Sequence, residues 1–191
     1  MKPGSSSKGS GADLPEANPK IKKTLFTSEQ IQKRVNEIAR QVSKDYEGKS
    51  LNVVCVLENG FMFMADFVRQ LDRPVVCQFV RPELKDTLKG TTATTEIFFT
   101  PEVDVSGKNI LLIEALVQSG VTSEFLIRNF TSRGAATVKL AALLDKQSER
   151  KVSLTPDYLG FLLDESYVVG YGLGAPQVGR NLPYIGAIAQ D

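Results

Sequence analysis

The sequence contains no histidine. Histidine is the commonest general base and zinc ligand, so its absence excludes the usual zinc sites and any Ser-His or Cys-His nucleophile. The chain also has no apolar run near the roughly 18 residues that a membrane helix needs. Its first residues lack the apolar core of a signal peptide. We therefore expect a cytoplasmic protein that has no membrane partner.

An excess of charge of one sign is lacking too. The formal net charge is only +1, which predicts no nucleic-acid partner and no general attraction to polyanions. Cysteine is scarce, and Cys55 and Cys77 both lie in strand-like runs. We interpret them as reduced core residues rather than as a disulfide or a metal-binding pair.

The length and composition indicate one folded domain with a tail. The chain has 191 residues, of which 42% are hydrophobic and 24% are charged, as is ordinary for a globular protein. The first part of the chain is rich in Ser, Gly and Pro and shows no periodicity. We predict a disordered tail over residues 1–22 and a single domain over residues 23–191.

A helix is predicted from about Ser28 to Tyr46. Thr27 and Gln30 fit a capping box at its start, and Gly48 fits its end. One apolar stripe runs along it, made of Ile31, Val35, Ile38, Val42 and Tyr46.

The rest of the chain alternates between segments with the periodicity of a strand and segments with the periodicity of a helix. Strands are expected at 51–57, 75–80, 109–115, 137–144, 158–163, 167–172 and 184–188, with helices at 60–71 and 122–132. Residues 81–95 are predicted to form a long polar loop, and an edge strand begins at Thr95. This alternation favours an α/β fold with an open, mostly parallel sheet flanked by helices. Ligands bind beyond the carboxyl ends of such strands, so the loops after Leu57, Glu114, Leu144 and Tyr171 are the expected site.

The loop Gln118–Thr122 joins a buried strand to a helix. Unpaired main-chain N–H groups at a helix start favour an anion, Gly120 allows close approach, and Ser119 and Thr122 add hydroxyl donors. These features predict a phosphate site, although an N-cap without a ligand fits the loop alone equally well. A Walker loop is excluded because its Gly-Lys pair is absent.

Longer stretches resemble a known family. LLIEALVQSGVT is similar to the phosphoribosyl loop of type I phosphoribosyltransferases of the hypoxanthine-guanine branch. VVCVLENGFMFMADFVRQL, VKLAALLDKQ and PDYLGFLLDESYVVGYGLG resemble other parts of that branch, so the resemblance spans most of the chain. It implies the type I phosphoribosyltransferase fold, with a small hood formed by the terminal segments.

The resemblance also implies roles for single residues. Lys146 would recognise the exocyclic oxygen of a purine, Tyr167 would stack on the base, and the backbone of Val168 would read the base edge. Without the resemblance, Lys146 could equally be a solvated lysine, and Tyr167 and Val168 ordinary strand residues. Glu114 would hold the ribose. The phosphate-binding residues would be Ser119, Gly120, Val121 and Thr122. The pyrophosphate site would be formed by Glu58, Asn59, Gly60 and Arg180.

The sequence departs from the family pattern where acids are expected. Ala115 replaces the second of two adjacent acids, Gln118 replaces the general base, and Gly174 replaces a magnesium-binding aspartate. Other departures are Glu58-Asn59-Gly60 where the family has a lysine followed by a glycine, and Val121 in place of a basic residue. The family's Ser-Tyr pair is not found in 83–95. Magnesium, the cofactor that the resemblance implies, prefers oxygen ligands, often carboxylates. Because most of the expected carboxylates are replaced, we predict no metal site on the protein.

These departures favour a family member that binds a purine nucleotide or base but transfers phosphoribose weakly or not at all. Loss of a general base alone slows a reaction by a factor on the order of 10²–10⁴, and the amide of Gln118 is not a competent base. The alternative is an active purine phosphoribosyltransferase, a glycosyltransferase of purine salvage that uses phosphoribosyl diphosphate with Asp145 or Glu114 as its base. The resemblance further implies a homo-oligomer, either a dimer or a tetramer.

A dinucleotide-binding enzyme is a weaker alternative. Residues 170–174 read GYGLG, which superficially suggests a glycine fingerprint. The spacing is wrong, the segment is close to the C-terminus, and Pro176 opposes a helix directly behind it.

Overall fold

The computed structural model describes residues 20–89, 92–100, 102–165, 167–174 and 178–188. Residues 1–19 of the predicted tail lie outside this part of the chain. Ile21 and Lys22, which the predicted boundary assigned to the tail, belong to strand β1 (Ile21–Phe26). In the described part, no helix is both long and apolar enough to cross a membrane.

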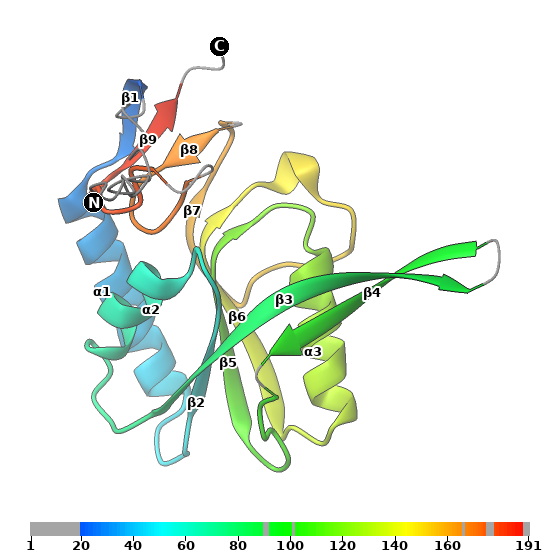
Figure 1. Cartoon of the computed structure of the whole chain (residues 1–191). Helices are drawn as coiled ribbons and strands as arrows, with labels where there is room; N and C mark the ends of the chain where they lie inside the picture. The colour runs from blue at the N-terminus through cyan, green and yellow to red at the C-terminus, as the bar shows by residue number, and fades with distance from the viewer. Residues whose placement is uncertain (1–19, 90–91, 101, 166, 175–177, 189–191) are drawn as a thin grey trace, which may run out of the picture.

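A six-stranded sheet forms the centre of the molecule, with the strand order β4-β3-β2-β5-β6-β7 (Figure 1). In this spatial order, each neighbouring pair of strands from β3 through β2, β5 and β6 to β7 is parallel. β4 pairs with β3 as an antiparallel edge strand. The strands are β2 (Asn52–Val56), β3 (Val76–Lys89), β4 (Thr92–Thr100), β5 (Asn109–Val117), β6 (Thr137–Asp145) and β7 (Tyr158–Leu162). The open, mostly parallel sheet expected from the sequence is thereby confirmed.

Helices cover both faces of this sheet, so its central strands are buried on both sides (Figure 1). On one face lie α1 (Ser28–Asp45) and α2 (Phe61–Val68), and α3 (Val121–Ser132) lies on the other. The capping box between Thr27 and Gln30 is present, and the predicted apolar stripe of α1 is buried. Alternation along β5 sends Leu111 towards α1 and α2 and Leu112 towards α3.

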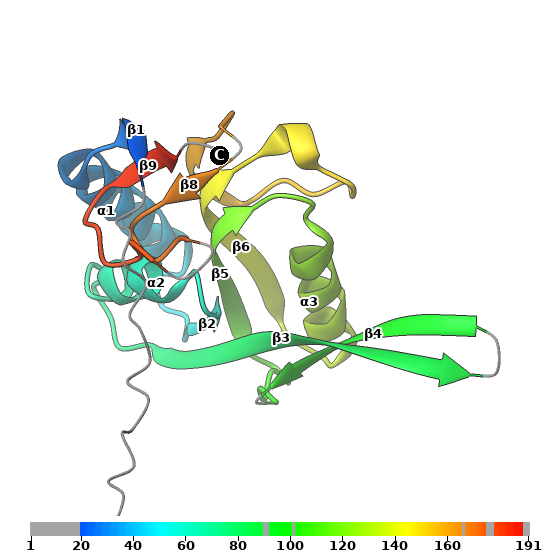
Figure 2. The ribbon, with the colours of Figure 1, turned by 45° about the horizontal axis from the view of Figure 1, so that its top comes forward.

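The predicted polar loop at 81–95 is wrong. β3 continues to Lys89 and pairs with β4 in an antiparallel hairpin, in a register from Arg81 opposite Thr100 to Lys89 opposite Thr92. The hairpin projects away from the body of the molecule (Figures 1 and 2). Pairing within a hairpin satisfies the main chain without requiring a periodic pattern, so the polar composition of 81–95 gave no sign of these strands.

The prediction that both cysteines lie in the core holds only for Cys55. Both cysteines are free thiols, and Cys77 is exposed. In the strand-like run 75–80, Val80 alone is buried. β4 pairs with β3 only from Arg81 onward, so the first part of β3 lies at the edge of the sheet. An apolar run at the flank of a sheet therefore looks like a core strand in the sequence without being one.

A second, smaller sheet forms the hood that the resemblance implied. It contains β1, β9 (Ile185–Ile188) and β8 (Val168–Val169), in that antiparallel order. It joins the two ends of the described chain above α1 and α2 (Figure 1). The rings of Phe26 in the hood and Phe161 in β7 stack with their centroids 4.2 Å apart, which ties the hood to the larger sheet.

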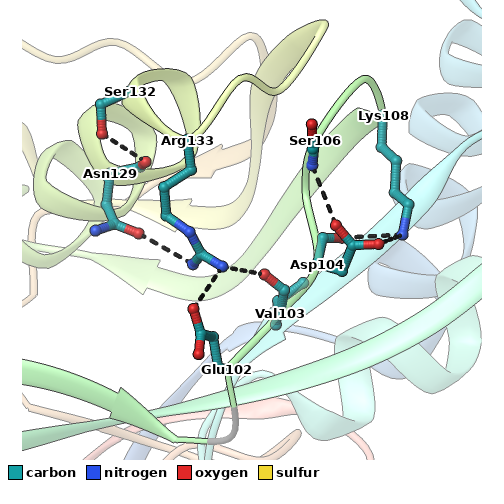
Figure 3. A network of polar contacts seen from close by, with 8 residues as sticks. All are labelled: Glu102, Val103, Asp104, Ser106, Lys108, Asn129, Ser132 and Arg133. Atoms are coloured by element: carbon teal, nitrogen blue, oxygen red, sulfur yellow. Dashed lines mark hydrogen bonds and ion pairs between the residues drawn. The ribbon is translucent and has the colours of Figure 1, made fainter.

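Polar contacts fasten the connection between β4 and β5 to the end of α3 (Figure 3). The Arg133 guanidinium donates to the Glu102 carboxylate over 2.9 Å and to the Val103 carbonyl over 2.7 Å. Lys108 pairs with Asp104 over 2.6 Å on the same connection. These contacts fix the start of β5, the strand that carries the predicted phosphate loop.

Candidate functional site

Glu114 lies near the end of β5, on the face that α3 covers. Its carboxylate accepts a hydrogen bond of 2.7 Å from the Ser123 hydroxyl. Burial raises the pKa of Glu114 to about 7, although the Ser123 hydrogen bond and the Arg150 charge act in the opposite direction. Near neutral pH this carboxyl group therefore exchanges a proton instead of holding a fixed charge.

The loop after β5 turns sharply at Gly120, which caps α3 in a left-handed conformation with a φ of 77°. A Cβ atom at this position would lie 2.9 Å from both Arg150 Nη1 and Val152 Cγ2, so only glycine fits without rearrangement. The Ser119 hydroxyl accepts a weak hydrogen bond of 3.4 Å from the Val121 N–H. The start of α3 is thus packed closely against the segment that follows β6.

That segment contributes a lysine and an acid. Lys146 follows β6 and is buried, with only 3% of its side chain exposed. Its Nζ pairs with Glu149 Oε1 over 2.5 Å, and Glu149 Oε2 accepts a 3.2 Å hydrogen bond from the Gln118 amide. The interpretation of Lys146 as a solvated lysine is therefore wrong, and Glu149 links the predicted purine-binding lysine to the residue at the general-base position.

Arg150 reaches from the same segment towards the loop. It forms an ion pair with Asp145, which is almost fully buried. Only 13% of its side chain is exposed, and within the described residues its Nη1 atom has no hydrogen-bond partner. The site therefore offers one buried cationic N–H group beside Gly120.

An open pocket of about 530 Å³ lies over these residues. The residues that line it come from the loop after β5 and from the segment after β6, namely Gln118, Ser119, Ser148, Glu149, Arg150 and Lys151. Both segments follow the carboxyl ends of neighbouring parallel strands, where the α/β fold places its ligands. The pocket is large enough for a small phosphorylated ligand.

Tyr167 and Val168 lie in the hood, apart from the residues that line the pocket. Tyr167 is 50% exposed. Its carbonyl group accepts a 3.1 Å hydrogen bond from Ile188, and Val168 pairs with Ala187 of β9. Their backbone thus serves the hood sheet, while the Tyr167 ring is available to a ligand.

A second cluster of charges forms around Glu58, which follows β2. Glu58 Oε1 accepts a 2.7 Å hydrogen bond from Arg81, and Oε2 accepts one of 3.0 Å from Arg180. The Arg180 guanidinium also donates to the Gly174 carbonyl, over 3.3 Å from Nε and 3.2 Å from Nη2. Glu58 thus stands between two cations that come from β3 and from the loop after β8.

Asn59 and Gly60 fix the loop that carries Glu58. Gly60 caps the start of α2, and a Cβ atom there would lie 2.6 Å from Cys55 Sγ and 2.8 Å from the Val56 carbonyl oxygen. A Cβ atom at Gly172 of the hood would lie 2.6 Å from the Asn59 carbonyl oxygen. The hood and the loop are therefore in close backbone contact beside the charge cluster.

Comparisons with known proteins place the chain in a family. Residues 22–175 match the phosphoribosyl transferase domain family. The hypoxanthine-guanine phosphoribosyltransferase of Bacillus subtilis is 34% identical over 170 residues, which make up 88% of this chain and 93% of that protein. The chain belongs to the hypoxanthine-guanine phosphoribosyltransferase family.

Solved structures and other relatives of the hypoxanthine-guanine phosphoribosyltransferase family agree. A crystal structure of the Bacillus anthracis hypoxanthine-guanine phosphoribosyltransferase has a TM-score of 0.80 and 34% identity, and covers 89% of this chain and 99% of that one. The bifunctional protein TilS/HprT of Listeria innocua is 34% identical over 173 residues, which are 90% of this chain but 26% of that protein. The type I phosphoribosyltransferase fold predicted from the resemblance is confirmed.

The donor chemistry of the site does not fit the magnesium ion that the family implies. In the ranges that the structure describes, no group of three or more His, Cys, Asp or Glu residues is placed to hold a metal. Ala115, Gln118 and Gly174 offer no carboxylate, and Glu58 is paired with two arginines. Magnesium prefers oxygen ligands that are often carboxylates, and Glu114, the buried acid of β5 that precedes the loop, is bonded to Ser123.

Sequence reasoning missed three residues that shape these clusters: Glu149, Arg150 and Arg81. A signal for the first two was available, because SERK begins three residues after the end of a strand whose carboxyl end was expected to face the ligand. Arg81 carried no such signal. It lies inside β3, in the segment predicted to be a loop, and its partner Glu58 is 23 residues away.

Proposed function

We propose that this member of the hypoxanthine-guanine phosphoribosyltransferase family binds a purine nucleoside 5′-monophosphate and transfers phosphoribose weakly or not at all. Ser119, Gly120, Val121 and Thr122 would hold the phosphate. Glu114 would contact the ribose, and Lys146, Tyr167 and Val168 would contact the purine. Glu58, Asn59, Gly60 and Arg180 would form the altered pyrophosphate site.

One observation carries the phosphate part of the proposal. The Arg150 guanidinium has an unpartnered, buried N–H group beside Gly120, at the start of α3. A buried cation and a helix N-terminus both favour an anion, and a phosphate oxygen at this position would satisfy the orphaned donor. The neighbouring pocket of about 530 Å³ leaves room for the rest of a nucleotide.

Weak transfer is supported by the residue at the general-base position. The side chain of Gln118 is an amide, which cannot accept a proton as a carboxylate does, and it donates to Glu149. Deprotonation of the incoming purine is therefore left without the expected base. Loss of a general base costs a factor on the order of 10²–10⁴ in rate.

Isothermal titration with IMP and GMP tests the binding half, with inosine as the ligand that lacks the phosphate. We expect both nucleotides to bind and inosine to bind at least 10-fold more weakly. Arg150→Lys keeps the charge beside Asp145 but withdraws the guanidinium, and should weaken IMP about 10-fold. Arg128→Lys, an exposed arginine of α3 that pairs with Glu124, is the matched control. No heat at millimolar IMP or GMP would end the proposal.

The transfer half needs a separate assay in which purine, phosphoribosyl diphosphate and magnesium are mixed. We expect little nucleotide to form, and formation at rates ordinary for the family would refute weak catalysis. The double variant Gln118→Asp/Ala115→Asp restores two acids. A gain in activity would show that the scaffold is otherwise competent, whereas no gain would implicate Glu58 and Gly174 as well.

One observation favours the alternative, an active purine phosphoribosyltransferase with a substituted base. Burial raises the pKa of Glu114 to about 7, a value suited to proton transfer at neutral pH. Asp145 is less suited, because Arg150 and Gln147 both donate to its carboxylate. Under this alternative, Glu114→Gln abolishes nucleotide formation in the transfer assay.

Self-association into a dimer or tetramer stays a prediction that follows from the family. Analytical ultracentrifugation of the full chain at micromolar concentration tests it directly.

A further inference from the structure

We infer that Glu58 fills an oxyanion site with its own carboxylate and thereby makes the chain reject ligands that carry a diphosphate. The inference deepens the proposed function, on which it rests for the class of ligand rejected. Under this inference, Glu58 determines specificity against diphosphates. It does so by pairing with Arg81 and Arg180, the two cations that would otherwise bind the diphosphate.

The geometry is that of a built oxyanion site. Each oxygen of the Glu58 carboxylate accepts a hydrogen bond from a different guanidinium, over 2.7 Å from Arg81 and 3.0 Å from Arg180. Planar guanidinium groups recognise carboxylate and phosphate oxygens by the same charge-assisted hydrogen bonds. Two guanidiniums that converge on one oxyanion from separate segments therefore suit a phosphate as well as they suit Glu58.

Arg180 is held in place by contacts that do not involve Glu58, and Arg81 is fixed through its backbone in β3. The Arg180 guanidinium is bonded through two of its nitrogens to the Gly174 carbonyl, and the Arg180 carbonyl accepts a 2.9 Å hydrogen bond from Gly172. Arg81 is anchored in β3 directly after Val80, whose carbonyl bonds to Leu57 over 2.8 Å. Removal of the Glu58 charge would therefore leave the Arg180 guanidinium close to its present position and the Arg81 side chain within reach of the same site.

Access and charge then decide what the cluster binds. The side chains of Arg81, Glu58 and Arg180 are 55%, 38% and 20% exposed, so an anion from solution can reach them. With Glu58 in place, a diphosphate would meet a carboxylate of like charge and lose the two guanidiniums as partners. The phosphate loop at Ser119 follows β5 instead of β2, so a monophosphate bound there needs neither arginine.

Isothermal titration with inorganic pyrophosphate tests the inference. EDTA is present throughout, so that no metal contributes. We expect the full wild-type chain to give no measurable heat at millimolar pyrophosphate and Glu58→Gln to bind it at least 10-fold more tightly. In the double variant Glu58→Gln/Arg180→Gln the gain should disappear, because one of the two guanidiniums is lost.

Glu102→Gln is the matched control, because it removes the same charge from an exposed carboxylate that pairs with Arg133 (Figure 3). We expect this variant to gain no affinity for pyrophosphate. An equal gain in Glu102→Gln would reduce the effect to net charge and overturn the inference. Circular dichroism checks the fold of each variant, and Glu58→Ala provides the same comparison if Glu58→Gln does not fold.

Two further outcomes would contradict the inference: Glu58→Gln that binds pyrophosphate within twofold of the wild type, or micromolar binding by the wild type itself. A parallel titration of the wild type with IMP separates this inference from the proposed function. Absence of IMP binding contradicts the proposed function alone, because the pyrophosphate comparison uses no nucleotide.

Discussion

At the scale of single residues, Glu114 is an acid whose surroundings oppose its charge. In the described part of the chain its hydrogen-bond donor is the Ser123 hydroxyl, and it lies on the apolar face between β5 and α3. Burial therefore outweighs the hydrogen bond and raises its pKa from 4.5 to about 7. The folded chain keeps this proton between pH 4.5 and 7, where the unfolded chain has released it.

The unfolding free energy should therefore fall as the pH rises through that window and level off above pH 7. At about 1.4 kcal/mol per pKa unit, the full effect of Glu114 is at most about 3 kcal/mol. Glu114→Gln removes it, so the stability of this variant relative to wild type should rise by about 2 kcal/mol from pH 5 to pH 8. Urea denaturation at the two pH values measures the difference. A constant difference would show that Glu114 is already ionised at pH 5.

The residue scale also shows where sequence reasoning stopped. Gln118 and Lys146 were recognised one by one because each occupies a position of the family pattern. Glu149, which bonds to both, lies three residues beyond Lys146 in a short 3₁₀ turn. A partner set by tertiary geometry of this kind leaves no periodic trace in the sequence.

At the scale of elements, the start of α3 depends on its glycine cap. Gly120 and Gly48 both have a positive φ, 77° and 72°. A Cβ atom at Gly120 would approach Arg150 and Val152 within 2.9 Å, whereas one at Gly48 would meet nothing within 4 Å. A substitution would strain the backbone at both positions, but the added side chain would meet neighbouring atoms only at Gly120.

Gly48→Ala should therefore lower the unfolding free energy by about 1 kcal/mol, the cost of a left-handed conformation for a residue with a Cβ. Gly120→Ala should lower it by at least about 2 kcal/mol, because overpacking adds to the strain. Chemical denaturation compares the variants. Titration with IMP should show weaker binding for Gly120→Ala alone. Equal losses of stability would mean that Arg150 moves aside without cost.

Helices and strands were predicted correctly where packing against the core requires a regular pattern of apolar residues. The stripe of α1 and the buried run of β2 are read directly from the sequence, because one packs on one face and the other on both. Prediction failed for the β3–β4 hairpin and for β1, which carry no comparable constraint. β1 is held by its pairing with β9, more than 150 residues away, and no local pattern announces that contact.

At the scale of the whole molecule, the hood is joined to the main body by a shared apolar cluster and by polar contacts. Tyr171 follows β8, and its hydroxyl donates a hydrogen bond of 2.7 Å to Asp66 of α2. The Tyr158 hydroxyl makes a similar bond of 2.8 Å to Asp45, but between β7 and α1 within the main body. In both cases burial comes first among the causes that raise the pKa of the tyrosine, so each hydroxyl stays protonated and able to donate.

Tyr171→Phe and Tyr158→Phe should each lower the unfolding free energy by about 1 kcal/mol, the usual value of one hydrogen bond. They should differ in amide hydrogen exchange. Tyr171→Phe should speed exchange in β8 and β9 while β5 stays protected, and Tyr158→Phe should leave the hood unchanged relative to the rest. Exchange that rises equally across the chain in both variants would show that the hood and the main sheet open only together.

The pairing of Glu58 with Arg81 and Arg180, and of Glu149 with Lys146, means that the protein carries its own counterions. A carboxylate that belongs to the chain stays beside its cations, so a dissolved anion must displace it in order to bind. An incoming anion gains only the difference between its own contacts and those of the carboxylate it displaces. Dissolved anions therefore meet these two clusters already neutralised, whereas Arg150 beside Gly120 still has one N–H group without a partner in the described residues.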